Sequence, residues 1–275
     1  MSVRPLRQQL ELIASLAKRD LKVRYKDSVL GFFWSLFRPA FLTLVLWAVF
    51  AHILVVPFSI PGIPYWLHVL VSVLSWNFLV GSLFDASGSI LSNANLIKKV
   101  RLDAEVFPVA CIVANAVHFV LALALVVAVL ILGGYGLHWE ILLLPAVIGV
   151  QVLLILGLAF YVSALNVFYR DVGSMLELGT LAWFYVTPII YPLNFAREQV
   201  IARAGETGFM LYMLNPAAAI IAGIRRFLLY GDARAEVSDP QLGTYLVISF
   251  AVSLVIAVTG WLLFRRLSER FADEL

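Results

Sequence analysis

The first residues of the sequence that could do chemistry form a basic cluster between positions 18 and 27. Five cations and two carboxylates lie there, and the cations are Lys18, Arg19, Lys22, Arg24 and Lys26. Each Lys or Arg beside an anionic membrane leaflet contributes about 1 kcal/mol of binding free energy, so the excess of three cations contributes on the order of 3 kcal/mol. The cluster is expected to orient its segment on a membrane surface without anchoring it alone.

A second group of candidate binding residues is aromatic and lies in the apolar stretch 176–192. Its members are Trp183, Phe184, Tyr185 and Tyr191. Aromatic side chains near lipid head groups are ordinarily interfacial belt residues. Their flat apolar faces could instead stack on sugar rings, so a pore-lining role would fit a glycan. Pro188 removes a backbone donor and should kink or break the helix near its outer end.

Other kinds of site are missing from the sequence. Neither a G-x-x-x-x-G-K-[ST] phosphate loop nor a G-x-S-x-G nucleophile motif occurs. The four histidines lack metal-ligand spacing and the single cysteine, Cys111, lies in an apolar run, so no metal site and no disulfide are expected. The middles of the apolar segments hold almost no ionisable residues, which disfavours a carrier coupled to protons or sodium. An energy source must come from outside this chain.

Composition places these candidates in a membrane protein with several spans. The chain is 62% hydrophobic and 13% charged, with a mean hydropathy of +0.95, whereas soluble domains carry roughly 25% charged residues. The formal charge of +3 could suggest nucleic acid. At this hydropathy, however, the distribution of charge across the bilayer matters more than the total. Residues 1–28 lack a continuous apolar core before a small-residue cleavage site, so no cleavable signal peptide is expected.

The basic cluster lies in residues 1–34, where the apolar spacing predicts an amphipathic helix. Apolar residues recur every three or four positions at Leu6, Leu10, Ile13, Ala17 and Leu21. A helix with a basic polar face lies in the plane of the membrane interface. A plain positive-inside anchor with no further role explains this feature equally well.

Residues 35–275 are expected to form one transmembrane domain, which makes the chain an all-α membrane protein. Six apolar runs are long enough to span, near residues 35–56, 65–86, 107–132, 140–168, 176–192 and 243–264. An even number of spans puts both termini on one side. Fifteen of the 20 Lys and Arg residues fall on that side and five on the other. The positive-inside rule then places both termini in the cytoplasm.

The cytoplasmic connection after the second span is expected to carry a short helix over residues 89–100. Serines that could cap it are Ser87, Ser89 and Ser92. An apolar pair followed by two lysines, residues 96–99, could dock into a groove on a soluble partner. A solvated loop that obeys the charge rule is the alternative, and the residues alone favour that alternative.

The outer connection 193–240 is too long for a turn and too apolar to be solvated. Its apolar runs 209–214 and 217–224 are each too short to cross a membrane, and Asn215-Pro216 separates them. Two re-entrant half-helices would satisfy their backbone only if protein shields them or they line a cavity. They would then form a lid at the external mouth. An interfacial hairpin is equally well supported.

Four runs of sequence point to a known family. They are RYKDSVLGFFWSLFRP (24–39), SNANLIKKVRL (92–102), NVFYRDVGSMLELGTLAWFYVTPIIYP (166–192) and LNPAAAIIAGIRRFLL (214–229). In this order they resemble the membrane subunit of ABC exporters for lipid-linked polysaccharides, the ABC-2 permease type that includes the O-antigen and wall teichoic acid exporters. The resemblance implies a homodimer of six-span subunits with two copies of a separate ATPase, which binds ATP and Mg²⁺. No cofactor is expected in this chain itself.

The resemblance also implies roles for individual segments. Residues 6–26 correspond to the interface helix, residues 89–100 to the coupling helix that docks on the ATPase, and residues 196–230 to the re-entrant outer helices. The candidate coupling residues are Asn93, Asn95, Leu96, Ile97, Lys98 and Lys99.

Residues and resemblance together predict an exporter subunit of the cytoplasmic (inner) membrane, without catalytic residues of its own. Its expected substrate is a polyprenyl-pyrophosphate-linked polysaccharide, with O-antigen first among the candidates. The diphosphate is expected to meet the basic cluster, since arginine binds phosphate bidentately. The glycan is then expected to pass the aromatic group of residues 183–191. Membrane lipids are expected partners and nucleic acid is not.

Alternative functions remain open at this point. The same architecture could export wall teichoic acid, capsule, or a small lipid or drug. A membrane-embedded glycan-modifying enzyme would share the hydropathy, but it should place acidic or histidine clusters at a membrane face. The nearest candidates are Asp103 with Glu105 and Arg170 with Asp171, which we interpret as loop charges.

Overall fold

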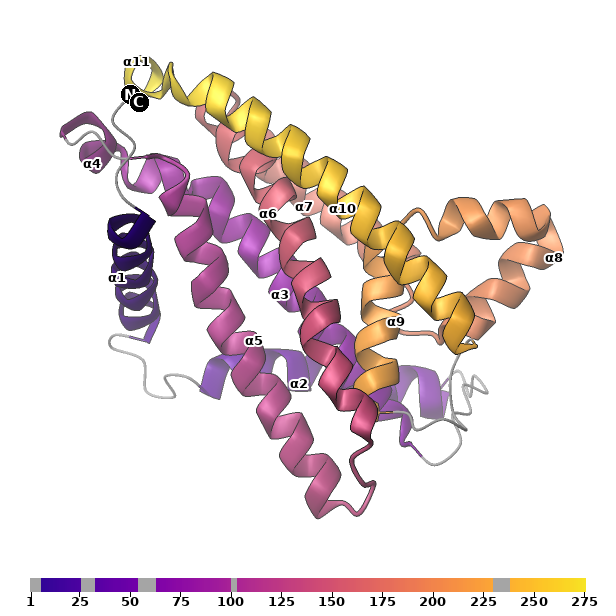
Figure 1. The fold of residues 1–275 in the computed structure, drawn as a ribbon. Helices are drawn as coiled ribbons and strands as arrows, with labels where there is room; N and C mark the ends of the chain where they lie inside the picture. Colours follow the sequence, from indigo (N-terminus) through magenta and orange to yellow (C-terminus); the bar gives the residue numbers. More distant parts are fainter. Residues whose placement is uncertain (1–5, 26–32, 54–62, 100–102, 230–237) are drawn as a thin grey trace.

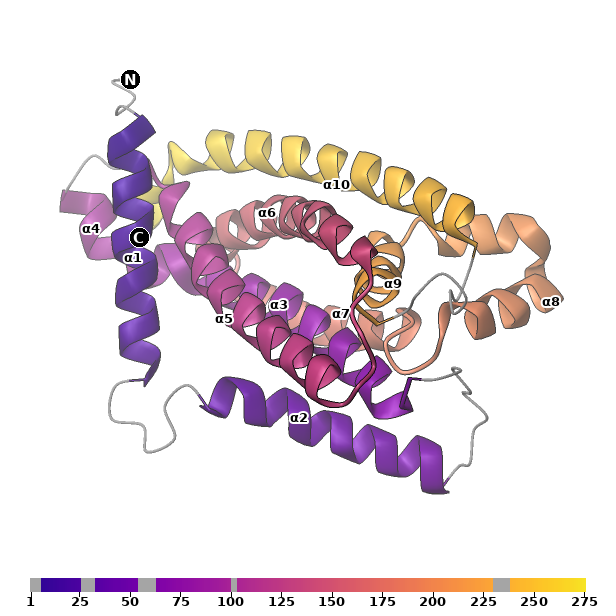
Figure 2. The ribbon, with the colours of Figure 1, turned by 60° about the horizontal axis from the view of Figure 1, so that its bottom comes forward.

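The structure, a computed structural model, describes residues 6–25, 33–53, 63–99, 103–229 and 238–275, and every regular element within these ranges is helical. In chain order the elements are α1 (Leu6–Tyr25), α2 (Phe33–Trp47), η1 (Ala48–Ile53), α3 (Tyr65–Ser92), α4 (Ala94–Lys99), α5 (Val106–Leu132), η2 (Trp139–Leu143), α6 (Leu144–Phe168), α7 (Val172–Val186), α8 (Leu193–Tyr212), α9 (Pro216–Leu229), α10 (Asp239–Ser268) and α11 (Phe271–Glu274). Figures 1 and 2 both show α1, α4 and α11 at one end of the molecule, which we call the α1 end. The far end carries α8 and the first turns of α10 (Figure 1).

Four helices are long and apolar enough to cross a membrane. They are α3, α5, the continuous segment Trp139–Phe168 and α10, with 28, 27, 30 and 30 residues. At 1.5 Å per residue each is about 40 to 45 Å long, which exceeds the roughly 30 Å of a hydrocarbon core. They coincide with the predicted spans 65–86, 107–132, 140–168 and 243–264. Four of the six predicted spans are therefore confirmed as helices of spanning length.

The predicted first span, residues 35–56, is only partly visible. Its apolar part forms a shorter helix, Phe37–Ile53, whose last turn is π-helical, and residues 54–56 lie outside the described ranges. Pro39 lies inside α2. The prediction of a full span is therefore not confirmed for these residues.

The predicted fifth span, residues 176–192, is wrong in its bounds. Helix α7 begins earlier, at Val172, and ends at Val186, and Thr187 then adopts an extended backbone with ψ of 140°. Pro188 cannot donate to a preceding carbonyl, so the expected break falls where the sequence placed it. Fifteen residues make a helix of about 22 Å, which is shorter than the hydrocarbon core.

In its described residues before α10, the connection 193–240 contains two helices, but α8 has 20 residues and begins at Leu193, where a half-helix over 209–214 was expected. Helices α8 and α9 are bent by 87° relative to each other and together reach the length and hydropathy of one span. The break between the two helices lies at residues 213–215, directly before Pro216, and so includes the predicted Asn215-Pro216 step. A second break lies inside α8 at Gly205, where φ is 68°, a left-handed backbone that glycine adopts without strain. By length and composition the pair is either a broken span or a re-entrant loop, so the described residues contain four candidate spans, or five with this pair.

Helix α3 is the centre of the fold. Of the 18 residues in its most apolar stretch, 72% are buried, against 17% in the most apolar stretch of α10. Helices α2, α5, α6, α7 and α9 all pack against α3, while α10 packs on α6 and α9. Figure 2 shows α10 lying along one side of α6, away from α3. Helix α3 is therefore enclosed by neighbouring helices on most sides.

Helices α6 and α10 approach each other closely through two glycines. A Cβ atom added to Gly157 would lie 2.6 Å from the backbone nitrogen of Ala257, and one added to Gly260 would lie 2.4 Å from the carbonyl oxygen of Gly157. Small residues allow membrane helices to pack backbone to backbone. Because lipid is itself apolar, such helices associate through van der Waals contact and not through the hydrophobic effect. This contact holds α10 against the rest of the fold.

Candidate functional site

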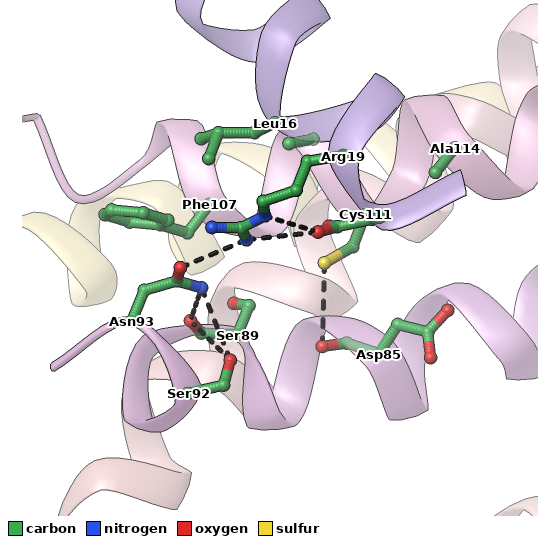
Figure 3. Close-up of a pocket in the computed structure, with 11 residues that line it drawn as sticks. Leu16, Arg19, Asp85, Ser89, Ser92, Asn93, Phe107, Cys111 and Ala114 are labelled. Atoms are coloured by element: carbon green, nitrogen blue, oxygen red, sulfur yellow. Dashed lines mark hydrogen bonds and ion pairs between the residues drawn. The ribbon is translucent and has the colours of Figure 1, made fainter. Parts of the chain in front are cut away.

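A cavity of about 190 Å³ lies at the α1 end, between α1, the last turns of α3 and the first half of α5. Figure 3 shows this junction cavity with Arg19 and Leu16 entering from α1, Asp85, Ser89 and Asn93 from the end of α3, and Phe107 and Cys111 from α5. Helix α1 is the predicted amphipathic helix. It buries Leu16 and Ala17 and packs on α5.

Arg19 connects α1 to the end of α3. Its guanidinium donates two hydrogen bonds to Asp20 Oδ1, at 3.0 and 3.1 Å, and a third to Asn93 Oδ1 at 3.1 Å (Figure 3). The carboxylate of Asp20 neutralises the arginine, so the contact with Asn93 is a directional hydrogen bond rather than a charge pair. The interface helix and the end of α3 are thereby joined through one side chain.

Asn93 forms hydrogen bonds with three elements at this junction. Its side-chain amide donates to the Ser89 carbonyl at 2.8 Å, and its own carbonyl accepts the N–H groups of Leu96 at 2.9 Å and Ile97 at 3.2 Å. Helix α3 therefore ends at Asn93 and α4 begins from it. Asn93 therefore contacts α3, α4 and Arg19 of α1.

The expected serine cap of the short helix is wrong. Helix α3 continues to Ser92, and the hydroxyls of Ser87, Ser89 and Ser92 donate to carbonyl oxygens three residues earlier on α3. Serine hydroxyls satisfy themselves in this way inside helices, and the apolar packing of α3 favours the longer helix. The short helix is therefore α4 alone, within the predicted range 89–100.

The candidate coupling residues divide between two faces of α4. Asn95, Leu96 and Lys98 are exposed, and Leu96 has an exposed fraction of 39%. Ile97 packs against the apolar cluster that includes Leu16, Ile90 and Phe107. The side chain of Lys99 lies outside the described residues. The apolar pair of residues 96 and 97 is thus split into one outward and one inward side chain.

The structure separates the five cations of the basic cluster. Lys18 and Lys22 are exposed and four residues apart, so they share one face of α1. Arg19 turns toward Asn93 instead. The side chain of Arg24 and all of Lys26 lie outside the described residues. Of the three cations whose side chains the structure describes, Lys18 and Lys22 offer an open surface, while Arg19 is part-exposed and bonded to Asp20 and Asn93.

Two carboxylates that we interpreted as loop charges hold the junction together. Asp103 accepts a hydrogen bond from Gln9 of α1 at 2.8 Å. Glu105 accepts one from Trp261 Nε1 of α10 at 3.0 Å and lies 3.9 Å from Arg265. These partners are far apart in the sequence, so no local pattern could have revealed the contacts.

The aromatic group of residues 183–191 does not form one surface. Trp183 donates through Nε1 to Asn215 Oδ1 at 2.8 Å, and its ring centroid lies 5.5 Å from that of Trp76 in α3. Phe184 packs on the same tryptophan at 5.8 Å. Tyr185 has an exposed fraction of 64%, while the Tyr191 hydroxyl donates to the carbonyl oxygens of residues 185 and 186. Tyr185 is therefore the most open of the four candidate lining residues.

At the far end, sequence reasoning missed two buried arginines of α9. Arg225 has no exposed surface, and its Nη1 donates to Ser72 Oγ at 3.0 Å and to the Pro188 carbonyl at 2.6 Å. Arg226 donates to both carboxylate oxygens of Asp239, at 2.8 and 2.9 Å, and lies 3.8 Å from Glu140. The adjacent pair was visible in the sequence, but its partners lie in four different elements. The two arginines tie α9 to α3, to the α7–α8 connection, to η2 and to α10.

Comparisons with known proteins agree with this architecture. A family described as ABC-2 type transporter matches residues 11–229. The chain is 29% identical over 273 residues to an O-antigen export system permease protein of Myxococcus xanthus, covering 99% of this chain and 98% of that protein. It is 27% identical over 267 residues to an O-antigen export system permease protein of Klebsiella pneumoniae, covering 96% and 95% of the two chains.

Proposed function

Because the chain belongs to the ABC-2 type transporter family as a membrane permease subunit, we propose that it moves a polyprenyl-pyrophosphate-linked polysaccharide, most specifically an O-antigen, across the cytoplasmic membrane. The observation that carries this proposal is the alignment with O-antigen export permeases over nearly the full length of both chains. Permeases of this family are transport subunits, so the ATP is hydrolysed by a partner ATPase.

The exposed face of α4 is the proposed docking surface for that ATPase. Asn95, Leu96 and Lys98 offer an amide, an apolar side chain and a cation to a groove on the partner. The proposed assembly contains two copies of this chain and two of the ATPase. In this arrangement both termini face the cytoplasm, as the distribution of Lys and Arg predicts.

The proposed transmission of force runs through Asn93. Closure of the ATPase dimer on ATP would push α4, and Asn93 would pass the displacement to α3 and, through Arg19, to α1. The bonds of Asp103 to Gln9 and of Glu105 to Trp261 would carry the same displacement to α1 and α10. Each link is a single hydrogen bond with a net strength of about 1 kcal/mol, so the junction can rearrange at small cost.

In the proposed mechanism the diphosphate first meets the exposed cations of α1. Lys18 and Lys22 supply positive charge at the membrane surface, and Arg24 and Lys26 extend the cluster along the chain. The glycan then passes the aromatic group of residues 183–191, where Tyr185 offers the most exposed ring. The proposed role of the bent pair α8–α9 is to cover the external mouth.

Replacement of Lys22 and Arg24 by Gln tests this function. We expect ATP-dependent export of lipid-linked O-antigen from reconstituted vesicles to fall about tenfold, because two charge-assisted contacts with the diphosphate are lost. Co-purification with the ATPase should be unchanged, since these residues lie away from α4.

The matched control is Arg266→Gln, which removes an exposed cation at the end of α10. Export equal to wild type in the double variant would remove the diphosphate role of the basic cluster. Failure of the wild-type chain to export O-antigen with any ATPase of its own cell would overturn the proposed function itself.

A further inference from the structure

A second cavity, of about 420 Å³, lies between α2, α3 and α5. Its polar lining consists of Arg38 of α2, Asn77 of α3, and Asn115 and His118 of α5. The remaining wall is apolar and includes Leu42, Leu74, Phe78 and Phe119. We call this space the lateral cavity, because Arg38, Leu42 and Asn77 are exposed at its rim.

The lateral cavity reaches deep into the spanning region. His118 is 12 residues beyond the start of α5, and Asn77 is 15 residues before the end of α3. At 1.5 Å per residue these positions lie about 18 and 22 Å from the helix ends that form the α1 end. The cavity therefore opens near the middle of the apolar helices, where polar groups are expensive unless they serve a function.

Arg38 is a cation in this apolar setting. It lies in α2 between exposed Phe37 and Phe41. Among the residues that the structure describes, none forms an ion pair with Arg38 within 4 Å. An arginine facing lipid is stabilised by an anion, so the position calls for a negatively charged ligand.

A polar row connects the lateral cavity to the junction cavity. Asn115, in the wall of the lateral cavity, donates to Asp85 Oδ2 at 2.6 Å, and Asp85 lines the junction cavity. On α3, Asn77, Gly81 and Asp85 follow at four-residue spacing, so they share one face of the helix. The row leads from the basic helix α1 to Arg38. Both N–H groups of Asn115 are used, on Asp85 and on the Cys111 carbonyl at 3.0 Å, so Asn115 is part of the cavity wall and not a donor to a ligand.

The donors that face the lateral cavity select for an anion with several acceptor oxygens. Arg38 offers up to five N–H donors in a planar fork, and the amide of exposed Asn77 offers two more. A phosphate or diphosphate accepts such a set bidentately. The apolar wall suits the first part of a hydrocarbon chain attached to that phosphate. The shared chemistry is the phosphate head group of a membrane lipid.

We propose that the lateral cavity binds the diphosphate head group of the polyprenyl-linked substrate, with Arg38 as its charge partner. The identity of the lipid rests on the proposed function, whereas the site itself rests on the cavity and its donors. The substrate enters from the lipid beside α2, and its diphosphate lies at Arg38 while the glycan remains at the α1 end. The cations of α1 provide the first contact and Arg38 the second, deeper one.

Binding to the complete complex of this chain and its ATPase tests the proposal. The complex is titrated in neutral detergent with undecaprenyl diphosphate, undecaprenol and phosphatidylglycerol, and bound lipid is counted by native mass spectrometry. In Arg38→Gln we expect the affinity for undecaprenyl diphosphate to fall about tenfold or more, since a hydrogen bond to a charged group is lost, while undecaprenol binds as before. Arg38→Lys should retain part of the affinity, because it keeps the charge without the fork.

Two further variants protect the test against misfolding. Asn77→Leu removes an exposed amide from the cavity without touching α2, and we expect a loss of about three- to tenfold for the diphosphate alone. Arg266→Gln, at an exposed cation outside the cavity, should bind all three lipids as wild type does.

Wild-type affinity for undecaprenyl diphosphate in both Arg38→Gln and Asn77→Leu would overturn the site. Phosphatidylglycerol that competes equally with undecaprenyl diphosphate and is lost equally in Arg38→Gln would make the cavity a phospholipid site and overturn the substrate assignment. Export assays on the same complexes keep the two proposals apart. If the wild type exports and Arg38→Gln binds normally, only the cavity proposal fails. If Arg38→Gln loses the diphosphate but the wild type exports no O-antigen, only the proposed function fails.

Discussion

Arg226 near the far end and the arginines of the α1 end hold their charges in opposite ways, while α8 also carries an exposed pair, Arg197 with Glu206 at 3.4 Å. At the far end the side chain of Arg226 is 3% exposed and bridges Asp239 and Glu140, and that of Glu140 is 5% exposed. At the α1 end the side chains of Arg19 and Arg265 are 45% and 50% exposed, beside partners that are exposed by 32% and 37%. Exposed pairs contribute roughly 0 to 1 kcal/mol, whereas removing one partner of a buried pair costs about 3 to 5 kcal/mol. The far end is therefore held in one arrangement, while the α1 end can change its contacts at small cost.

This difference fits a transporter that receives force at one end. In the proposed mechanism the α1 end responds to a partner. Its polar contacts are single hydrogen bonds through Arg19, Asn93 and Asp103, beside the apolar packing of Leu16 and Ala17. The far end carries a sharply bent helix pair whose backbone is interrupted, and such irregular structure needs firm support from side chains. Arg225 supplies part of that support by donating to the carbonyl of Pro188, in the connection where the chain leaves the helical geometry.

The largest effect is expected from Arg226→Met at the far end. The change leaves Glu140 buried without its arginine, so the free energy of unfolding should fall by about 3 to 5 kcal/mol. Thermal unfolding of the purified chain in detergent measures this loss. The matched variant Arg265→Met at the α1 end breaks an exposed contact and should cost at most about 1 kcal/mol. Equal losses in the two variants would contradict the contrast between the ends.

An intermediate effect is expected from Asn215→Ala, which acts on the bend between α8 and α9. Asn215 accepts hydrogen bonds from Trp183 Nε1 and the Ala217 N–H, and it donates to Thr187 Oγ1. Losing these bonds should cost about 1 to 3 kcal/mol, and tryptophan fluorescence should report the change around Trp183. Asn194→Ala is the control, because Asn194 is exposed and bonds only to the adjacent N–H among the hydrogen bonds described. If Asn215→Ala unfolds at the same temperature as Asn194→Ala, Asn215 does not stabilise the bend.

The smallest effect on stability is expected from Asn93→Ala at the α1 end. The same variant should strongly reduce the export obtained per ATP hydrolysed. The hydrogen bonds of its side chain, one buried and two part-buried, contribute about 1 to 2 kcal/mol to folding in total. Export per ATP hydrolysed should nevertheless fall severalfold, because α4 loses its link to Arg19. The ratio of export to ATP hydrolysis in vesicles measures this. Ser87→Ala, which removes a hydroxyl bonded back to the Phe84 carbonyl on the same helix, should leave the ratio unchanged. An unchanged ratio in Asn93→Ala would exclude Asn93 as the transmitting residue.

Much of the fold follows from local features. The three- and four-residue spacing of Leu10, Ile13 and Ala17 is enough for α1, and long apolar runs are enough for α3, α5, α6 and α10. Pro188 and Pro216 mark breaks because proline lacks the N–H that a helix interior needs. The features that failed depend on competition between elements. Ser89 and Ser92 could cap a new helix or extend the old one, and the packing around α3 decided for extension.

The candidate site was less accessible to sequence reasoning. Helices α1 and α4 fall within the segments that the sequence indicated, while α8 is much longer than the run 209–214, and the roles of these segments stay predictions. Which side chains face one another was not visible: Arg19 turns to Asn93 while Lys18 and Lys22 stay exposed, and Ile97 turns inward while Leu96 turns outward. No pattern in the sequence indicated that Arg38 lines a cavity with residues of two other helices.

The sequence alone therefore determines the membrane class, the main helices and their breaks, through hydropathy, periodicity and proline positions. These features depend only on the free energy of a short segment in water, at an interface or in lipid. The pairing of Arg226 with Glu140 and Asp239, the contact of Arg19 with Asn93, and the meeting of Arg38, Asn77 and His118 around one cavity belong to the tertiary structure. They join side chains tens of residues apart, and only the packing of α3 against its neighbours brings those side chains within reach.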